Sequence, residues 1–252
     1  MIFIVRVSDS ERLSFYQKFL FALAVICLSS SVMKAQDWAQ FGKYASANDT
    51  VKVKPVAVFM GDSITEGWYR TDPDFFTDNN FLGRGISGQT SSQMLVRFRR
   101  DVIDLHPKYV VILAGTNDIA RNNGEIALKN ILGNIISMCE LAKANKIKPV
   151  LCSVLPCTQF TWRKEVTDAA EQIVALNKML KEYAESSKIT YVDYHSAMKN
   201  EEGGLPRSIA RDGVHPNIDG FKIMEPMILG SVGQISVRDL YPVDAEPSAV
   251  IL

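Results

Sequence analysis

The stretch Val56-Ala57-Val58-Phe59-Met60-Gly61-Asp62-Ser63-Ile64-Thr65 joins a short apolar run to a segment with helical character. An apolar run of this length, bounded by a glycine, is typical of a buried strand. In an open α/β sheet, ligands bind outside the carboxyl ends of the strands, where each strand gives way to the N-terminus of a helix. The stretch therefore predicts a strand followed by a helix, with Ser63 at the edge of the sheet where ligands bind.

Further apolar runs predict the other strands of the sheet. The run over residues 108–114 is continuous rather than alternating, as expected for a strand covered on both faces, and we predict that it is central. The remaining strands are predicted over residues 51–60, 80–85, 150–155 and 189–192.

Apolar residues at helical spacing alternate with these strands. A first helix is expected after Ser63, interrupted at Pro73 and followed by a loop. Further helices are predicted over residues 90–104, 125–144, 164–187 and 217–229. Strands that alternate with helices imply right-handed crossovers and a parallel sheet between two helix layers. The sequence thus predicts one domain over residues 51–232, an α/β three-layer αβα sandwich.

Composition narrows the class of function. The chain has 252 residues, with 28 Lys and Arg against 28 Asp and Glu, which is enough for one sizeable core and leaves no basic surplus. A surplus of basic charge is the first sign of a nucleic-acid-binding protein, so we expect no nucleic-acid partner.

The amino terminus resembles an export signal. Lys18 precedes an apolar run over residues 19–28, which is too short for a spanning helix, and small and polar residues follow. We expect residues 1–35 to be a signal peptide that is cleaved after Ala35, and the mature protein to be periplasmic or secreted without stable membrane insertion. Lipidation at Cys27 is a less favoured alternative. Residues 36–50 are expected to form an arm over the domain, and residues 233–252 a tail of unassigned role.

Removal of the signal leaves Cys139, Cys152 and Cys157, an odd number that argues against a disulfide framework. Pairing of Cys152 with Cys157 stays open on the sequence alone. The cysteine spacing and the three histidines of the chain give no metal-site pattern, and we expect no metal or cofactor.

Ser63 has an ordinary structural explanation that must be weighed against a chemical one. The stretch Ser63-Ile64-Thr65-Glu66 fits a capping box, in which a serine and a glutamate satisfy the free amides of a helix. Three other stretches, each next to a predicted strand or helix, favour chemistry. They are Gly85-Ile86-Ser87-Gly88-Gln89-Thr90, Ala114-Gly115-Thr116-Asn117-Asp118 and Arg211-Asp212-Gly213-Val214-His215-Pro216.

Asp212 and His215 are three residues apart, so one tight turn can bring the carboxylate to an imidazole nitrogen. Pro216 biases His215 away from helical backbone and holds it ahead of the last helix. A histidine held in this way can take a proton from a serine while the aspartate fixes its tautomer. His106 is expected at the opposite end of the sheet, and His195, which follows the last predicted strand, is a weaker candidate for the base.

Acyl transfer also needs hydrogen-bond donors that face the developing oxyanion. The sequence offers three candidates: the Ser63 amide at a helix N-terminus, the Gly88 amide in a glycine-rich loop, and the Asn117 side chain after the central strand. A phosphate-binding loop is the rival for the glycines, but neither phosphate-binding pattern is present.

In this order, the four stretches resemble the conserved blocks of the SGNH or GDSL family of esterases and lipases. The resemblance covers about residues 56–229, with Ile64 in place of the leucine that names the family. It implies a flavodoxin-like fold and metal-free ester hydrolysis, with Ser63 as nucleophile, His215 and Asp212 as its partners, and Gly88 and Asn117 in the oxyanion hole. Ser63 is not in a G-x-S-x-G elbow, so the α/β-hydrolase fold is disfavoured.

The substrate is less constrained than the chemistry. We expect a small-acyl ester on a carbohydrate, with an aromatic site mouth to which five residues are assigned: Trp68, Tyr69, Arg70, Phe160 and Trp162. The alternatives are a lysophospholipase or thioesterase of the same family and, more remotely, a non-catalytic carbohydrate-binding or nucleotide-binding module.

Overall fold

The computed structural model describes residues 17–20 and 37–233. Residues 17–20 are helical, while the predicted cleavage site after Ala35 and the tail beyond residue 233 lie outside the described residues. From Ala39 onward the described chain packs as one unit, separate from the segment that ends at Trp38. Within residues 17–20 and 37–233, no helix combines the length and the apolar character needed to cross a membrane.

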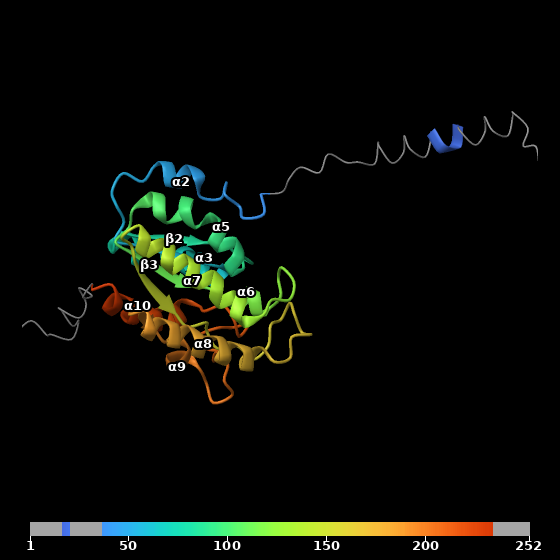
Figure 1. Cartoon of the computed structure of the whole chain (residues 1–252). Coiled ribbons are helices and arrows are strands. Elements are labelled where there is room, and N and C mark those ends of the chain that lie inside the picture. The colour runs from blue at the N-terminus through green and yellow to red at the C-terminus, as the bar shows by residue number, and fades with distance from the viewer. Residues whose placement is uncertain (1–16, 21–36, 234–252) are drawn as a thin grey trace, which may run out of the picture. The chain divides into compact units, whose positions relative to one another are not determined.

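The described part of the chain contains one parallel five-stranded sheet (Figure 1). Its strands, in spatial order, are β2 (Phe81–Gly85), β1 (Ala57–Gly61), β3 (Tyr109–Leu113), β4 (Lys148–Cys152) and β5 (Thr190–Val192). This 2-1-3-4-5 order is that of flavodoxin-like folds, and it confirms both the predicted fold class and the central position of the strand over residues 108–114.

Two apolar clusters pack against the two faces of the sheet, so the fold has three layers (Figure 1). One face is covered by α5 (Ser91–Asp101), α7 (Leu128–Ala144) and α8 (Ala169–Ser186). The other is covered by α3 (Ser63–Thr71), α4 (Pro73–Asp78), α9 (Tyr194–Met198) and α10 (Ile218–Ser231). The predicted three-layer arrangement is confirmed.

Several element boundaries differ from the prediction. The first strand begins at Ala57 rather than at residue 51, and Pro55, which has no amide to donate to a ladder, lies just before it. The predicted helix over 164–187 begins only at Ala169. Val166 lies in the preceding loop and is completely buried. An apolar residue that fits the helical period can therefore pack into the core without belonging to the helix.

The segment after Thr71, predicted as a loop, forms a helix of its own. The Asp72 carboxylate caps α4 by accepting a bond from the Phe75 amide over 3.4 Å, and Pro73 lies at the start of the helix. A proline is favoured at that position because the first amides of a helix have no internal partner.

The arm ahead of β1 is bonded to the domain through a short helix, α2 (Ala45–Asp49). Asn48 of this helix is buried; it donates to the Asp101 carboxylate over 2.7 Å and accepts from the Arg84 guanidinium over 2.8 Å. The Arg84 guanidinium lies over the ring of Tyr44, 4.8 Å from its centroid. The arm therefore closes one side of a buried polar network.

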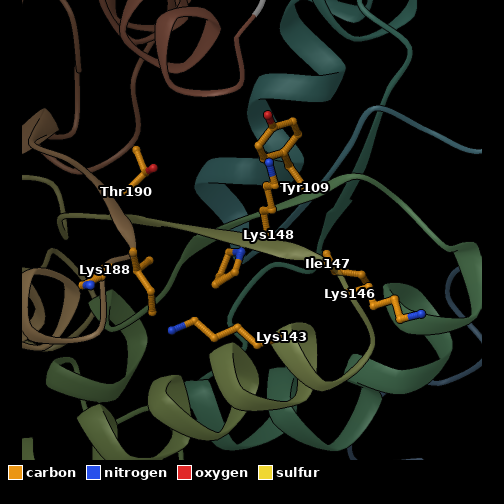
Figure 2. A pocket seen from close by; sticks show the side chains of 9 residues that line it. Tyr109, Lys143, Lys146, Ile147, Lys148, Lys188 and Thr190 are labelled. Carbon is orange, nitrogen blue, oxygen red and sulfur yellow. The ribbon is translucent and has the colours of Figure 1, made fainter.

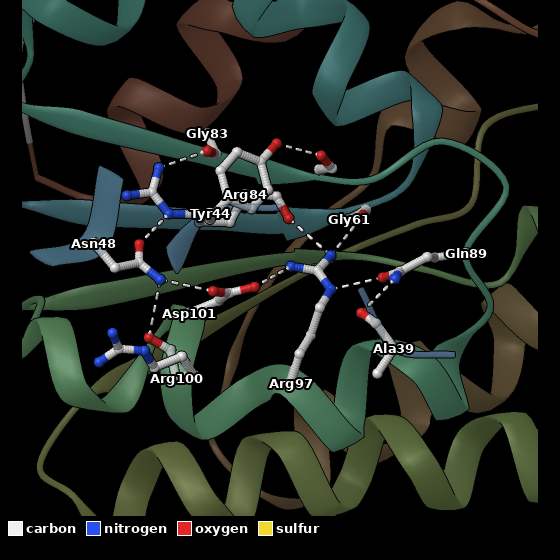
Figure 3. A network of polar contacts seen from close by, with 11 residues as sticks. Ala39, Tyr44, Asn48, Gly61, Gly83, Arg84, Gln89, Arg97, Arg100 and Asp101 are labelled. Carbon is white, nitrogen blue, oxygen red and sulfur yellow. Dashed lines mark hydrogen bonds and ion pairs between the residues drawn. The ribbon is translucent and has the colours of Figure 1, made fainter. Parts of the chain in front are cut away.

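Arg97, at the centre of this network, is fully buried (Figure 3). Its guanidinium donates to the Asp101 carboxylate over 2.8 Å and to the Gln89 side chain over 2.6 Å. It also donates to the main-chain carbonyls of Gly61 and Arg84 over 3.1 and 2.8 Å. One side chain thus fixes the carboxyl ends of β1 and β2 and the loop that follows β2.

Candidate active site

The strand order reverses at β1, which has β2 on one side and β3 on the other. Such a switch point leaves a crevice at the carboxyl ends of the two central strands, where ligands of open α/β sheets bind. Ser63 begins α3 directly after β1, and Asn117 lies in the short helix α6 (Thr116–Ile119) after β3. Two predicted site residues therefore lie on either side of the crevice.

The structure brings Ser63, His215 and Asp212 into one hydrogen-bonded row. The Ser63 hydroxyl lies 2.8 Å from Nε2 of His215, and Nδ1 of His215 lies 2.6 Å from Oδ2 of Asp212. A carboxylate can only accept a hydrogen bond, so Nδ1 carries a proton and the neutral ring presents a basic Nε2 to the serine. This is the geometry in which histidine can remove the serine proton.

A single turn holds the carboxylate against the imidazole. Oδ1 of Asp212 accepts the main-chain amides of Val214 and His215 over 2.9 and 2.8 Å, while Gly213 takes a positive φ of 79°. Burial raises the pKa of Asp212, but the hydrogen bonds from His215 and Val214 outweigh it and leave the pKa below its ordinary value. Asp212 therefore stays ionised beside the histidine at neutral pH.

The loop that carries His215 is fixed where the last helix begins. Asn217 caps α10 by accepting the Gly220 amide over 3.1 Å, and its side-chain amide donates to the Ser208 carbonyl over 2.7 Å. Both ends of the short segment from Asp212 to Asn217 are thus bonded, which restrains the imidazole.

Ser63 does not cap its own helix. The cap of α3 is Asp62, whose Oδ1 accepts the Ile64 amide over 2.9 Å. Glu66, the other half of the alternative capping box, instead accepts the Ser87 amide over 2.7 Å. The Ser63 hydroxyl is therefore left to face His215.

Asp62 is buried beneath the nucleophile. Burial raises its pKa to about 6, and the bond from the Ile64 amide offsets only part of that rise. Its second oxygen accepts the side-chain amide of Asn117 over 3.2 Å. Asp62 thus joins the helix start that carries Ser63 to Asn117 in α6, which follows the neighbouring strand β3.

The three predicted oxyanion donors lie at this same edge. The Ser63 amide belongs to the first turn of α3, where it has no helical partner. Gly88 is exposed and has a φ of 78°, and a Cβ there would lie in ordinary contact with Nδ2 of Asn122, 3.9 Å away. Asn117 is buried, and its amide nitrogen donates to the Gln89 carbonyl over 3.1 Å in addition to Asp62.

Asp118, the last residue of the GTND stretch, ties the asparagine loop to the neighbouring helix. Its carboxylate accepts the amide and the hydroxyl of Ser91 over 2.8 and 2.6 Å, at the start of α5. Burial raises the pKa of Asp118. The residue therefore fixes α6 and has no contact with the nucleophile's hydrogen-bonded row.

Three residues assigned to the site mouth lie away from the hydrogen-bonded row, and for Trp68 the assignment was wrong because the side chain is buried. Trp68 is only 1 % exposed and stacks on Phe75 and Phe221 in the core. Tyr69 and Arg70 lie in the last turn of α3, and six or seven residues of helix place them about 10 Å along its axis from Ser63. The helix that begins at the nucleophile carries them away from it.

The two assigned residues of the loop after β4 lie beside the histidine. Trp162 is 39 % exposed, and its ring centroid lies 6.0 Å from that of His215. Phe160 is fully buried and supports Trp162, with 5.3 Å between the ring centroids. Trp162 can contact a bound substrate directly, whereas Phe160 can act only through Trp162.

Sequence reasoning missed Asn122. Its side chain accepts the Trp162 indole N–H over 3.0 Å and donates to the Asn117 side chain over 2.7 Å. In the sequence it belongs to a polar Arg-Asn-Asn-Gly turn, and nothing there marks it as different from its neighbours.

The other histidines do not join the site. His106 lies at the amino end of β3, opposite the crevice, as expected. His195 lies in α9, where its main-chain amide donates to the Ser153 hydroxyl over 2.8 Å, and its side chain lines a surface hollow along α8. Of the histidines in the described chain, it is His215 that accepts the hydrogen bond from the Ser63 hydroxyl.

A cavity of about 460 Å³ lies at the opposite end of the sheet, along the amino ends of β3, β4 and β5 (Figure 2). Lys143, Lys146, Lys148 and Lys188 line it. Three of these lysines lie at the C-terminal ends of α7 and α8, where helix dipoles favour positive charge. Their charge is thus explained locally, and the cavity is remote from Ser63.

The three cysteines of the described chain, Cys139, Cys152 and Cys157, are free and buried, so no Cys152–Cys157 bond is formed. Burial raises the pKa of Cys152 to about 12 and that of Cys157 to about 11. Neither thiol is therefore in a reactive, thiolate-favouring environment.

The fold is a flavodoxin-like α/β sandwich, and the serine–histidine–aspartate row at the edge of its sheet has the arrangement seen in serine hydrolases. The chain belongs to the GDSL-like lipase/acylhydrolase family, whose model matches residues 59–223. That region contains all of the block residues singled out in the sequence, and the predicted family membership is confirmed. The protein is a hydrolase of ester bonds.

Two solved structures are similar over nearly their full length. A proposed acylhydrolase from Bacteroides fragilis is 48 % identical with a TM-score of 0.76, covering 79 % of this chain and 98 % of that one. A GDSL-like lipase from Bacteroides thetaiotaomicron is 49 % identical with a TM-score of 0.75, covering 77 % of this chain and 98 % of that one.

Two sequence relatives are more distant. An acetylxylan esterase from Geobacillus stearothermophilus is 26 % identical over 161 residues, which is 62 % of this chain and 74 % of that protein. The lipoprotein YqeF of Bacillus subtilis is 34 % identical over 80 residues, 31 % of this chain. The matched region spans only 33 % of that lipoprotein's length.

Proposed function

We propose that the protein is an exported serine esterase that removes small acyl groups, acetyl above all, from carbohydrates. The observation that carries the catalytic part is the hydrogen-bonded row of Ser63, His215 and Asp212, with 2.8 and 2.6 Å between successive partners. Export is supported by the apolar run over residues 19–28 and by the similarity to a lipoprotein.

In the first half of the reaction, Nε2 of His215 takes the Ser63 proton as the oxygen attacks the ester carbonyl. The imidazolium that forms is stabilised by the ionised Asp212, which also keeps the ring in the correct tautomer. The imidazolium then protonates the leaving alcohol, so the sugar hydroxyl departs and the acyl group stays on Ser63.

In the second half, His215 activates a water molecule that attacks the acyl-enzyme, and acetate leaves as Ser63 regains its proton. In both halves the carbonyl oxygen becomes negative and is held by the amides of Ser63 and Gly88 and by the side chain of Asn117. Asn117 turns to the oxyanion by loosening its long bonds to Asp62 and to the Gln89 carbonyl, 3.2 and 3.1 Å.

The substrate class is supported by two observations. Trp162 presents a partly exposed ring beside His215, and a flat aromatic surface of this kind suits the apolar face of a sugar. The acetylxylan esterase relative, by its name, removes acetyl groups from a polysaccharide. Together they favour an acetylated glycan over a long-chain lipid or a thioester.

The test is hydrolysis of p-nitrophenyl esters of increasing acyl length, followed by acetylated xylo-oligosaccharides, with the Ser63→Ala variant as control. We expect acetyl to be preferred and all activity to depend on Ser63. A preference for long acyl chains would favour a lysophospholipase or thioesterase instead. Equal rates in both proteins would contradict the nucleophile, and no activity in either would favour a binding module.

A further inference from the structure

We infer that Asn122 is a positioning residue of the oxyanion hole, which holds the side-chain amide of Asn117 in the orientation that acyl transfer needs. The inference rests on the proposed function, because that function makes Asn117 a donor. Nδ2 of Asn122 donates to Oδ1 of Asn117 over 2.7 Å and to the carbonyl of Gly88 over 3.2 Å. It therefore contacts two of the three oxyanion-hole residues.

The main-chain conformation at the C-terminal end of α6 places Asn122 next to Asn117. Arg121 takes a left-handed conformation with a φ of 56°, and its amide donates to the Asp118 carbonyl over 2.9 Å. The Asn122 amide then donates to the Asn117 carbonyl over 3.0 Å. These two bonds form the closure that commonly ends a helix, so the two asparagines are joined through both main chain and side chain.

The direction of each amide follows from the indole of Trp162. An indole N–H can only donate, so the atom of Asn122 that it meets at 3.0 Å is the oxygen. The other end of the Asn122 amide is then the NH₂ group, and the atom of Asn117 that it meets is also an oxygen. The indole of Trp162 thus determines the orientation of the Asn122 amide and, through it, that of the Asn117 amide. The NH₂ group of Asn117 consequently points toward the carboxylate of Asp62.

The bond from Asn122 is the one that can persist through the reaction. The two bonds made by Nδ2 of Asn117 compete with the oxyanion, because the same hydrogens must be offered to it. The bond on Oδ1 does not compete, since it uses the opposite end of the amide. When Nδ2 turns from Asp62 to the oxyanion, Asn122 keeps the amide from rotating out of reach.

The experiment is a double-mutant cycle between Asn122 and Asn117, with kcat and KM measured separately for p-nitrophenyl acetate. We expect Asn122→Ala to lower kcat about 10- to 100-fold with KM little changed, because a misplacement on the order of 1 Å can cost about 100-fold. In the Asn117→Ala background, the same change should lower kcat by less than about threefold, since the group that it positions is gone.

Two further variants keep the result interpretable. Asn122→Asp preserves the size of the side chain and the acceptor for Trp162, but it places a carboxylate oxygen against Oδ1 of Asn117, so we expect at least the loss seen with alanine. Asn123→Ala is the matched control in the same loop. Its amide donates to Thr90 and Gln93 over 2.9 and 2.7 Å, away from the oxyanion donors, and kcat should stay within about twofold of wild type.

The outcomes separate the inference from the proposed function. If Asn117→Ala leaves kcat unchanged, the oxyanion role of Asn117 fails, and the positioning role of Asn122 fails with it. If Asn117→Ala is strongly impaired but Asn122→Ala is not, only the role of Asn122 is wrong. An equal loss from Asn122→Ala in both backgrounds, or a rise in KM alone, would also overturn it.

Discussion

Among single substitutions in α5 that leave its exposed side chains unchanged, Arg97→Met should destabilise the protein most. The guanidinium makes four hydrogen bonds inside the domain, one of them an ion pair with the nearly fully buried Asp101. Removing one partner of a buried ion pair costs about 3–5 kcal/mol, because the remaining charge is left uncompensated.

The other bonds add to that cost unequally. The Gly61 carbonyl also accepts the Ile86 amide over 3.1 Å, so it keeps a partner when Arg97 is lost. The Arg84 carbonyl and the Gln89 side chain each lose a donor. An unmade buried bond costs about 1–3 kcal/mol, so the two together bring the expected loss for Arg97→Met to at least about 5 kcal/mol.

Thermal and urea unfolding, followed by circular dichroism, measure this loss. At about 2–4 °C of Tm per kcal/mol for a domain of this size, we expect Tm to fall by at least about 10 °C. Arg100→Met is the matched control on the same helix, because its ion pair with Asp49 is exposed and contributes at most about 1 kcal/mol.

A double variant tests whether the uncompensated charge is the cause. Arg97→Met combined with Asp101→Leu replaces both partners with apolar groups, and part of the lost stability should return. If Arg97→Met cost no more than Arg100→Met, the reasoning from buried charge would be refuted.

Three smaller predictions concern the catalytic loop, pH and helix ends. Asp212→Asn should lower kcat by about 10²–10⁴-fold, because an amide NH₂ at that position favours the tautomer of His215 that cannot accept the serine proton; steady-state kinetics checks it. The raised pKa of Asp62 means that the folded state keeps a proton which the unfolded state releases between about pH 4 and 6. Stability should therefore fall by about 3 kcal/mol as pH rises through that window, and urea titrations of wild type and Asp62→Asn should differ by this slope. Lys146→Gly and Lys188→Gly should each raise Tm by a few degrees, because both lysines occupy left-handed backbone, with φ of 61° and 53°, that costs a side chain about 1 kcal/mol.

The sequence predicted the sheet and the Asp212–His215 pair because both depend on short-range patterns. The run over residues 108–114 is continuous because both of its faces are covered, and its central position follows from that alone. Asp212 and His215 meet within a single turn, so their contact needs no knowledge of the rest of the fold.

The features that were not predicted from the sequence depend on contacts between segments that are distant in the chain. Trp68 was assigned to the site because it follows Ser63 closely in the sequence. Its burial depends instead on which face of α3 it occupies, and that face packs into the core. For Arg97 a signal did exist: Arg97 and Asp101 share the apolar stripe of α5 with Met94 and Phe98, at spacings of three and four residues. A charged pair within such a stripe indicates a buried ion pair.

The contacts of α2 show that the first residue matched by the family model and the first residue of the folded unit are different positions. The stretch matched by the family model begins at residue 59, yet Asn48 and Tyr44 lie upstream of it and complete the surroundings of Arg84. The carbonyl of Ala39 likewise accepts the side chain of Gln89, next to the loop that carries Gly88. The stretch matched by the family model is thus shorter than the unit that folds, and a protein cut to that stretch would leave a buried arginine facing solvent.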